Sequence, residues 1–405
     1  MPHIRKRHIE SNFDKIIKYS AITGIVGHRQ AGKTTFSESH TNEYYTFDDP
    51  DLLQEATANP KAFIQNHRKK GTTFDECQMV PEIFPILKET VRVNKSPGQF
   101  YLTGSVRFSS RIAIRESLTG RIVTLELLPL TLSEMLERPL PEIGQRLLNC
   151  NSLLPLVDEL KLLEKRNRSF SREIDLYLKK GGLPGICFMR DPKLTQQKVS
   201  AQLQTILDRD VRLVYPTTLP YSQIYEYVRA LALKEGQIWR PSELRRTTRI
   251  SEVTQKKLIQ ALTAVFVIRL VPCEGGRSGY SIWLEDQAEL NHFTGTNLPA
   301  NQKWRSFVFR NFREQFEYRL GFDHRMFQYR TRGGAWVPFA YQVEDKILGV
   351  IPIEGSEPQR SELFSAQSFL KAYIQSKVIF VSKDSGLQAI GTRMAVIPAT
   401  ILLFE

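Results

Sequence analysis

The chain has 405 residues, 41% of them hydrophobic and 24% charged, and this length predicts two or three globular domains. No apolar run reaches the roughly 18 residues that span a bilayer, so the sequence excludes a transmembrane helix. Lysine and arginine outnumber aspartate and glutamate by 56 to 43, which gives a net charge of +13. This balance favours acidic partners, with nucleic acid ahead of an anionic membrane surface.

The cysteines are isolated in the sequence, so neither a disulfide framework nor a cysteine metal site is indicated. They are Cys77, Cys150, Cys187 and Cys273. The basic residues 1–12 lack the apolar stretch of a signal peptide. We therefore expect a soluble, cytoplasmic protein.

Residues 1–135 alternate short β-rich runs with helical runs, which is typical of a parallel sheet covered by helices. In the helix expected over residues 82–93, Ile83, Leu87 and Val91 repeat every four residues. The predicted strands are residues 21–26, 44–47, 72–74, 100–103 and 122–127.

Residues 27–34, Gly-His-Arg-Gln-Ala-Gly-Lys-Thr, fit the pattern G-x-x-x-x-G-K-[ST] between a strand and a helix that begins at Lys33. Glycines let the backbone turn so that its N–H groups point at phosphate oxygens, and the helix N-terminus adds positive potential. Lys33 would reach the β- and γ-phosphates, and the Thr34 hydroxyl would ligate Mg²⁺. The sequence thus predicts an ATP and Mg²⁺ site built from Gly27, His28, Arg29, Gln30, Ala31, Gly32, Lys33, Thr34 and Thr35.

Asp75 and Glu76 follow the β-rich residues 72–74. A carboxylate at the end of a strand next to the P-loop strand can hold Mg²⁺ through water, which is the role expected of Asp75. Glu76 is then placed to polarise the attacking water as a general base. The alternative for such a pair is an ordinary solvated turn.

Two further groups carry weaker signals. Ser105, after the predicted strand 100–103, offers a small hydroxyl that would sense the γ-phosphate, although a strand-to-loop turn explains it nearly as well. Arg121, before the strand 122–127, would contact the transferred phosphate in cis or from a neighbouring subunit, as arginine fingers do. An ordinary surface charge is the alternative.

With these motifs placed, the chain resembles a prokaryotic family of AAA+-type ATPases in which an ATPase core precedes a winged helix and a restriction-endonuclease-like domain. The likeness is specific through about residue 270 and thin afterwards. It implies the roles given above for Lys33, Thr34, Asp75 and Glu76, and it favours Arg121 as a finger. The residues that carry it are 27–35, 45–50, 74–78, 102–105, 117–121, 181–184 and 208–211.

Residues 136–220 are predicted as a helical extension, and residues 221–290 as the winged helix. In the latter, helices over 242–247 and 251–264 precede a hairpin of residues 265–271 and 280–284. The second helix should bury Thr254, Leu258, Ala261, Leu262 and Val265. Cations beside its exposed face favour DNA binding, whereas a lid or subunit contact is the alternative. These cations are Arg245, Arg246, Arg249, Lys256 and Lys257.

Residues 300–405 form the domain in which the resemblance implies nuclease chemistry, but the acidic pattern is missing. Pro338 stands where the family has an Asp, Arg305 where it has an early Glu, and Glu354 lacks the lysine that should follow two residues later. A single carboxylate cannot fix a catalytic Mg²⁺. We therefore expect a degenerate nuclease-like fold whose basic residues either bind a phosphate backbone or form a solvated face. They are Arg305, Arg310, Arg313, Arg325, Arg330 and Arg332.

The sequence thus predicts an α/β protein with a P-loop NTPase parallel-sheet core, a helical and winged-helix middle, and a C-terminal α/β nuclease-like domain. Its expected function is ATP binding and hydrolysis with Mg²⁺, coupled to double-stranded DNA binding or to a switch in homo-oligomer assembly. The alternative is a nucleotide-dependent signalling or scaffold protein that binds protein partners and no DNA.

Overall fold

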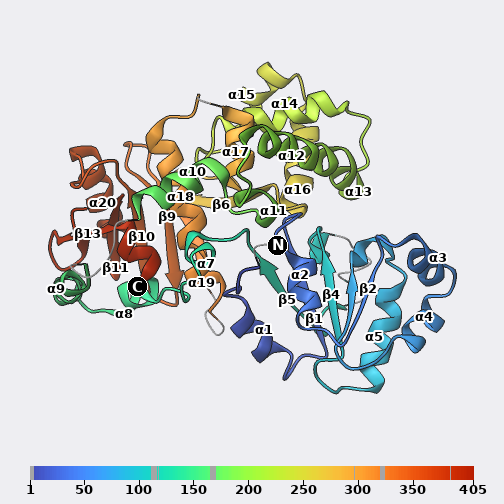
Figure 1. Cartoon of the computed structure of the whole chain (residues 1–405). Coiled ribbons are helices and arrows are strands. Elements are labelled where there is room, and N and C mark those ends of the chain that lie inside the picture. The colour runs from blue at the N-terminus through green and yellow to red at the C-terminus, as the bar shows by residue number, and fades with distance from the viewer. Residues whose placement is uncertain are drawn as a thin grey trace.

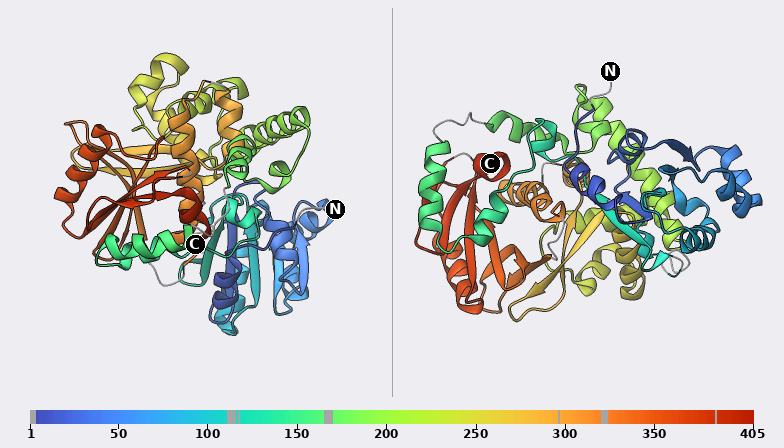
Figure 2. Two further views of the ribbon diagram at one scale, coloured as in Figure 1. Left: turned by 60° about the vertical axis from the view of Figure 1, so that its left-hand side comes forward. Right: turned by 90° about the horizontal axis from the view of Figure 1, so that it is seen from below.

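The computed structural model of the chain describes residues 4–110, 116, 118–164, 170–295, 297–319, 324–383 and 385–405. Figure 1 shows an N-terminal α/β core, a C-terminal α/β part on the opposite side and a helical lobe above, and Figure 2 shows them from two further directions. Within the described ranges, no helix is both long enough and apolar enough to cross a bilayer.

The N-terminal core is a five-stranded parallel sheet in the order β2-β3-β4-β1-β5. Every residue of β1 is buried, as expected for a parallel strand covered on both faces, whereas β2 at the sheet edge is only half-buried. The five predicted strands are confirmed, with bounds that differ by no more than one residue. They are β1 (Ile22–Gly27), β2 (Glu43–Thr46), β3 (Thr72–Asp75), β4 (Phe100–Gly104) and β5 (Ile122–Leu127).

Helices cover this sheet on both faces, and together they give a P-loop NTPase core (Figure 1). The predicted helix over residues 82–93 is confirmed, because α5 buries Ile83, Leu87 and Val91 in the same hydrophobic cluster as β3 and β4. The helices are α1 (Glu10–Ile16), α2 (Lys33–Glu38), α3 (Pro50–Ala58), α4 (Pro60–Asn66) and α5 (Ile83–Val93).

The helices that directly follow β5 pack on the C-terminal part, and the helices after them form the helical lobe. Helices α7 (Leu132–Met135), α8 (Ile143–Asn149), α9 (Leu153–Glu164) and α10 (Ser171–Lys180) share one hydrophobic core with the C-terminal sheet. The next helices, through α17, share a separate core. They are α11 (Pro184–Cys187), α12 (Pro192–Thr205) with its π-helical continuation Ile206–Asp210, α13 (Val211–Val214), α14 (Tyr221–Ala232), α15 (Pro241–Thr248), α16 (Glu252–Ala264) and α17 (Gln287–Thr294).

Helices α15 and α16 lie where the sequence predicts the two helices of a winged helix, and a hairpin follows them. The predicted buried face of α16 is confirmed for Leu258, Ala261 and Leu262, but Thr254 is only half-buried. Gln255 is buried beside it because its amide donates to the Pro241 and Ile250 carbonyls.

The C-terminal part is built on an eight-stranded sheet in the order β12-β13-β11-β10-β9-β8-β6-β7. Strand β6 pairs in parallel with β8, with Cys273 opposite Gln328, so the hairpin after α16 is continuous with the C-terminal sheet. The strands are β6 (Ile268–Glu274), β7 (Tyr280–Leu284), β8 (His324–Arg330), β9 (Trp336–Val343), β10 (Lys346–Pro352), β11 (Ser376–Ser382), β12 (Gln388–Ala389) and β13 (Met394–Pro398).

Helices pack on both faces of this sheet. Along β9, Phe339 and Tyr341 join the cluster that includes α18, whereas Ala340 faces the cluster that includes α20, as the two-residue period of a strand requires. The helices of this part are α18 (Ala300–Phe312), α19 (Glu314–Glu317), α20 (Arg360–Ala372) and α21 (Ala399–Phe404).

Two arginines expected at the surface of the C-terminal part are buried instead. Arg310 is 3% exposed and pairs with Glu235 at 2.6 Å, and Arg313 is 1% exposed and pairs with Glu285. A buried charge is tolerated only when it is paired, so both guanidinium groups have a structural role. Both alternatives given for these residues, phosphate binding and a solvated face, are therefore wrong for Arg310 and Arg313.

The N-terminal segment is fastened to the C-terminal part through His8. Its ring lies 2.9 Å from a carboxylate oxygen of Glu314, which also accepts hydrogen bonds from the Thr131 and Ser133 hydroxyls. Burial alone would lower the pKa of His8, but Glu314, Glu134 and the Arg138 carbonyl outweigh it and raise the pKa to about 9. The folded protein thus stabilises the protonated, imidazolium form of His8.

We expect stability to depend on pH through His8. Its folded pKa lies above the value of about 6.5 for an unfolded chain, so its contribution is complete below that pH and is lost as the pH rises through 9. The loss should be roughly 2 kcal/mol, allowing for the coupling with Glu314. Thermal unfolding of the wild type and of His8→Gln between pH 6 and 9.5 measures it. The wild-type Tm should approach that of the variant as the pH rises, and two parallel curves would contradict this assignment.

Candidate functional site

Residues 27–34 comprise the last residue of β1, the loop 28–32 and the first two residues of α2, at the carboxyl end of the parallel sheet. A side chain at Gly27 would place its Cβ 2.3 Å from the Leu127 carbonyl oxygen, so only glycine fits there. Gly32 has a φ of +96° at the N-cap of α2, in the left-handed region that glycine adopts without strain. These two positions explain why the loop needs its glycines.

Lys33 lies inside this loop, with its ammonium group 3.1 Å from the carbonyl oxygens of both Gly27 and His28. Burial lowers the pKa of Lys33, while Glu76 and Asp75 act in the opposite direction. The ammonium group is therefore short of compensating anions, and a phosphate group beside it would supply them.

Asp75 ends β3 and lies within reach of the P-loop helix. The Thr34 hydroxyl donates to its Oδ2 at 3.1 Å, and the hydroxyls of Tyr44 and Thr103 donate to the same carboxylate. The expectation that β3 is a direct neighbour of the P-loop strand is wrong, because β4 lies between β1 and β3. The carboxylate nevertheless meets Thr34, since both face the same edge of the sheet.

Glu76, the next residue, has a φ of +54°, a left-handed conformation that is uncommon outside glycine. The Ser105 hydroxyl donates to its Oε2 at 3.2 Å, and the Gln78 amide donates to the same oxygen. Burial alone would raise the pKa of Glu76, but Lys33, Gln78 and Arg29 outweigh it and hold the pKa below its usual value. A second carboxylate thus stays ionised beside Lys33, and Ser105 orients it.

Burial raises the pKa of Asp75, and the neighbouring Glu76 carboxylate raises it further. The buried Asp75 carboxylate, the half-buried Glu76 carboxylate and a hydroxyl at one edge are oxygen ligands of the kind that Mg²⁺ prefers. A divalent cation would offset the repulsion between them. The donor set formed by Thr34 and Asp75 therefore fits the metal that the sequence predicts.

Two arginines face the same edge: Arg29, which the sequence assigns to the nucleotide site, and Arg209, to which it assigns no role. Arg29 of the P-loop and Arg209 of the π-helical turn both pair with the buried Asp210, at 3.3 and 2.9 Å. Burial alone would lower the pKa of Arg209, but Asp210, Asp48 and Glu76 outweigh it and raise the pKa. Arg209 therefore lies within electrostatic reach of Glu76, from the helical lobe. A π-helical turn often marks a functional position. Residues 208–211 contribute to the family resemblance, which gives Arg209 no role.

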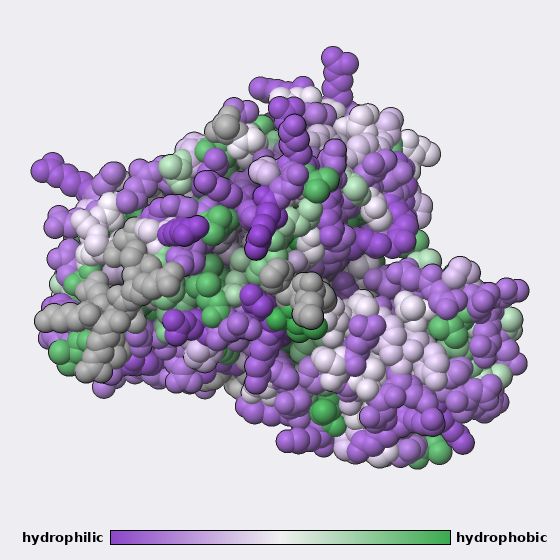
Figure 3. Space-filling view, in the orientation of Figure 1, coloured by the Kyte–Doolittle hydropathy of each residue, from purple (hydrophilic) through white to green (hydrophobic). Residues whose placement is uncertain are grey.

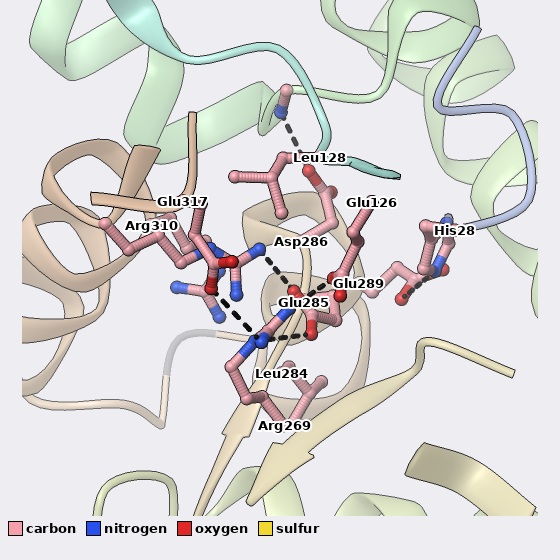
Figure 4. Close-up of polar contacts among 12 residues, drawn as sticks. His28, Glu126, Leu128, Arg269, Leu284, Glu285, Asp286, Glu289, Arg310 and Glu317 are labelled. Carbon is pink, nitrogen blue, oxygen red and sulfur yellow. Dashed lines mark hydrogen bonds and ion pairs between the residues drawn. The ribbon is translucent and has the colours of Figure 1, made fainter. Parts of the chain in front are cut away.

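The P-loop is also held by segments that are remote in sequence (Figure 4). His28 is 1% exposed, and its Nε2 lies 3.1 Å from Glu289 of α17. The Glu289 carboxylate also accepts a hydrogen bond from Gln202 of α12 at 3.2 Å, and the Ala31 carbonyl accepts one from Arg7 at 2.8 Å. A movement of the P-loop backbone at His28 would therefore also move or break the contacts with Glu289 and Gln202 of the helical lobe.

Of the remaining predicted residues, Gln30 has a φ of +62° in the loop and Thr35 is exposed on α2. Arg121 is not brought to the site. It precedes Ile122, which is opposite Ile22 at the start of β1, whereas the P-loop follows the other end of β1. The strand length separates them by roughly 20 Å. Ser117, which contributes to the family resemblance, lies outside the described residues.

The cations predicted to bind DNA all lie on α15, α16 or the turn between them, and all are exposed. Arg249 ends α15 with a φ of +57°, and the Lys257 ammonium lies 5.6 Å from the Tyr215 ring centroid. The carboxyl end of α16 is fixed to the ATPase core, because the Arg107 N–H donates to the Ala264 carbonyl at 2.8 Å. This end of α16, which follows the cationic residues Lys256 and Lys257, therefore lies beside the core.

Family comparisons agree with this geometry over part of the chain. Residues 19–136 match a family model described as an AAA domain, and residues 171–277 match one described only as a domain of unknown function. The N-terminal core is therefore of the P-loop ATPase type.

Similar proteins are distant in sequence. Uncharacterized proteins of Mycobacterium tuberculosis and Mycobacterium bovis are each 23% identical over 321 residues, which is 75% of this chain and 65% of theirs. The chain thus spans just under two thirds of these relatives. An uncharacterized protein of Methanocaldococcus jannaschii is 27% identical over 46% of this chain and 41% of its own length.

Among solved structures, a signal transduction ATPase with a tetratricopeptide repeat sensor from Pyrococcus horikoshii matches 76% of this chain and 47% of its own, with a TM-score of 0.27 and 11% identity. A DNA polymerase III gamma-subunit-related protein from Thermotoga maritima matches 64% of this chain and 97% of its own, with a TM-score of 0.25 and 11% identity.

We expect Arg209→Ala to weaken ATP binding about tenfold, the loss typical of one hydrogen bond to a charged group. Arg229→Ala is the matched control, because Arg229 is exposed on α14 and pairs only with Glu226 among the described residues. Titration calorimetry with ATP and Mg²⁺ measures both variants. Wild-type affinity in Arg209→Ala, with an unchanged Tm, would show that this guanidinium does not meet the nucleotide.

Proposed function

We propose that this chain binds ATP with Mg²⁺ at the P-loop and hydrolyses it, with Lys33 as the phosphate ligand and Glu76 as the general base. The observation that carries the proposal is the meeting of Lys33, Thr34, Asp75 and Glu76 at one edge of the sheet. The backbone N–H groups of residues 27–34 would bind the phosphates. Mg²⁺, when held by Thr34 and Asp75, would neutralise charge on the β- and γ-phosphates.

The residues around Glu76 support its role in orienting water. Its carboxylate is ionised and held by Ser105 and Gln78, so its remaining lone pairs are fixed in direction. It would accept a proton from the attacking water while Lys33 stabilises the charge that develops on the γ-phosphate. Arg29 and Arg209 are placed to add positive charge beside Glu76, and we propose them as further phosphate contacts in place of a cis role for Arg121.

We further propose that hydrolysis is coupled to movement of the helical lobe, and through it to DNA binding or to assembly. The coupling would run through His28 and Glu289, which join the P-loop to α17, and through Arg29 and Asp210, which join it to the π-helical turn. Loss of the γ-phosphate would remove an anionic partner of Arg29 and Arg209. Because both arginines also pair with Asp210 of the lobe, the position of the lobe would change with it.

We expect Glu76→Gln to lower ATP turnover by roughly 10²-fold to 10⁴-fold while ATP binding is retained, because the amide keeps the shape and cannot accept the proton. Lys33→Ala should lose binding as well as turnover. Glu89→Gln is the control, since this glutamate lies on the exposed face of α5 and pairs with Arg92. A steady-state phosphate-release assay measures all three. Wild-type turnover in Glu76→Gln would remove Glu76 from the mechanism.

The C-terminal part is proposed to keep a nuclease-like fold without nuclease chemistry. Pro338 is buried within β9, and its carbonyl accepts a hydrogen bond from Gln328 at 3.3 Å. Burial lowers the pKa of Arg305, and the nearby Glu354 and Glu362 act against this. A guanidinium thus lies in the field of the one glutamate that would serve as a metal ligand.

Purified protein should leave supercoiled plasmid intact over hours with Mg²⁺ or Mn²⁺, with or without ATP. The reason is that Glu354 alone remains of the family's acidic pattern and has the Arg305 guanidinium beside it, so a catalytic metal lacks its ligand set. Agarose electrophoresis of the plasmid reads the result. Nicking that Glu354→Ala abolishes would show that the proposed loss of nuclease activity is wrong.

A further inference from the structure

A basic groove, defined here by Arg240, Arg277, Arg330 and Arg332, runs along the junction between the helical lobe and the C-terminal sheet. Its open space measures about 680 Å³ and is lined by the segment that leads into α15, by the loop between β6 and β7, and by Arg332. Arg330 ends β8, two residues before Arg332. Figure 3 shows the face of the molecule that is seen in Figure 1. This face is mainly hydrophilic, and the apolar patches on it are small.

The sheet topology brings these arginines together. Strands β6 and β8 run in parallel, so the loops that follow them lie at the same end of the sheet. One loop carries Arg277 and the other carries Arg332. The segment before α15 is fixed to the same end of the sheet, because the backbone N–H of Trp239 donates to the Tyr280 carbonyl at 2.8 Å and Ile238 forms a β-bridge with Ser281. Arg240 follows directly. Three remote segments thus place guanidinium groups at one end of the sheet.

Glycines shape the loop that carries Arg277. Gly275 and Gly276 have φ values of +90° and +100°, and a Cβ at Gly275 would lie 2.6 Å from the Tyr329 ring. The loop therefore packs directly on β8, which holds Arg277 near Arg330.

Nearby acids are already paired elsewhere. Glu274, at the end of β6, pairs with Arg325 at 2.7 Å and accepts the Tyr373 hydroxyl hydrogen bond at 2.7 Å. Glu243 pairs with Lys234, and its contact with Arg240 is 3.8 Å long. Among the described residues, no carboxylate pairs with Arg277, Arg330 or Arg332 at ion-pair distance.

The positive charge of the neighbouring arginines affects the pKa of Arg330. Burial lowers the pKa of its guanidinium, and Arg277 and Arg240 lower it further. Arg330 lies over the Trp336 ring, with 5.2 Å between the guanidinium carbon and the ring centroid, and Arg305 lies over the same ring at 4.7 Å. Stacking on the indole restricts both guanidinium groups. The groove is thus repulsive by itself and favourable to a bound polyanion.

We propose that this groove binds the phosphodiester backbone of a nucleic acid. Arginine forks match phosphate oxygens, and guanidinium groups spread over three chain segments suit a repeating anion better than a single one. The lining of the groove does not include the exposed cations of α15 and α16, such as Arg245 and Lys256, which the sequence favours. The inference deepens the proposed coupling to DNA and rests on it.

The test compares Arg277→Ala/Arg332→Ala with the wild-type chain, using fluorescence anisotropy on three probes. These are random-sequence duplex DNA, single-stranded DNA and duplex RNA, each about 25 nucleotides or base pairs long. We expect Kd for the preferred probe to rise at least tenfold at about 100 mM salt. The slope of log Kobs against log salt on duplex DNA should fall by about 2, as for two lost phosphate contacts. The preferred probe identifies the kind of backbone.

Two further double variants remove equal charge elsewhere. Arg68→Ala/Lys95→Ala alters exposed residues of the N-terminal core and should bind like the wild type. Arg245→Ala/Arg246→Ala tests the α15 face. The proposal is overturned if no probe binds at about 50 mM salt, if the groove variant keeps wild-type affinity and slope, or if the core variant loses as much. ATP turnover without nucleic acid should be unchanged in each, so failure of the groove and failure of ATP hydrolysis are read separately.

Discussion

The arrangement of this molecule depends on one short buried polar segment, Glu285 to Glu289, between β7 and the first turns of α17. Glu285 pairs with Arg269 of β6 and Arg313 at the end of α18, and Asp286 accepts the Gly182 N–H at 2.8 Å. Glu289 meets His28 in the P-loop (Figure 4). Three parts of the chain are therefore fixed by carboxylates a few residues apart. Breaking one such contact leaves a buried charge unpaired, so these parts can change their relative arrangement only if the charges find new partners.

This constraint gives the nucleotide site its relation to the rest of the molecule. Arg269 also pairs with Glu126, on the strand that ends beside the P-loop, and Glu126 pairs with Arg107, which holds the carboxyl end of α16. The outer strand of the core and α16 are thus joined by one network of ion pairs and hydrogen bonds. A triphosphate bound at Lys33 would add charge close to Arg29 and Asp210, the pair that joins the P-loop to the π-helical turn of the lobe. We infer that nucleotide state and lobe position are energetically linked, which requires discrete rearrangement of these pairs.

The sequence predicts the parts of the site that are local. The glycine pattern, the strand before it, and Asp75 with Glu76 at a strand end all follow from residue types at short spacing, and the structure has β1, α2 and β3 there. What remained hidden depends on long-range pairing: β4 between β1 and β3, β6 joined to β8, and Asp210 holding both Arg29 and Arg209. Burial of Arg310 and Arg313 was missed for the same reason, because their partners Glu235 and Glu285 are remote in sequence.

The central claim is that Lys33, Thr34 and Asp75 form a site for ATP with Mg²⁺. The most direct measurement is titration calorimetry of the wild-type chain with ATP, in the presence of Mg²⁺ and again after chelation. The account predicts one ATP per chain with Mg²⁺ and much weaker binding without it. No heat of binding up to about 1 mM ATP, the upper end of ordinary enzyme affinities, would contradict it.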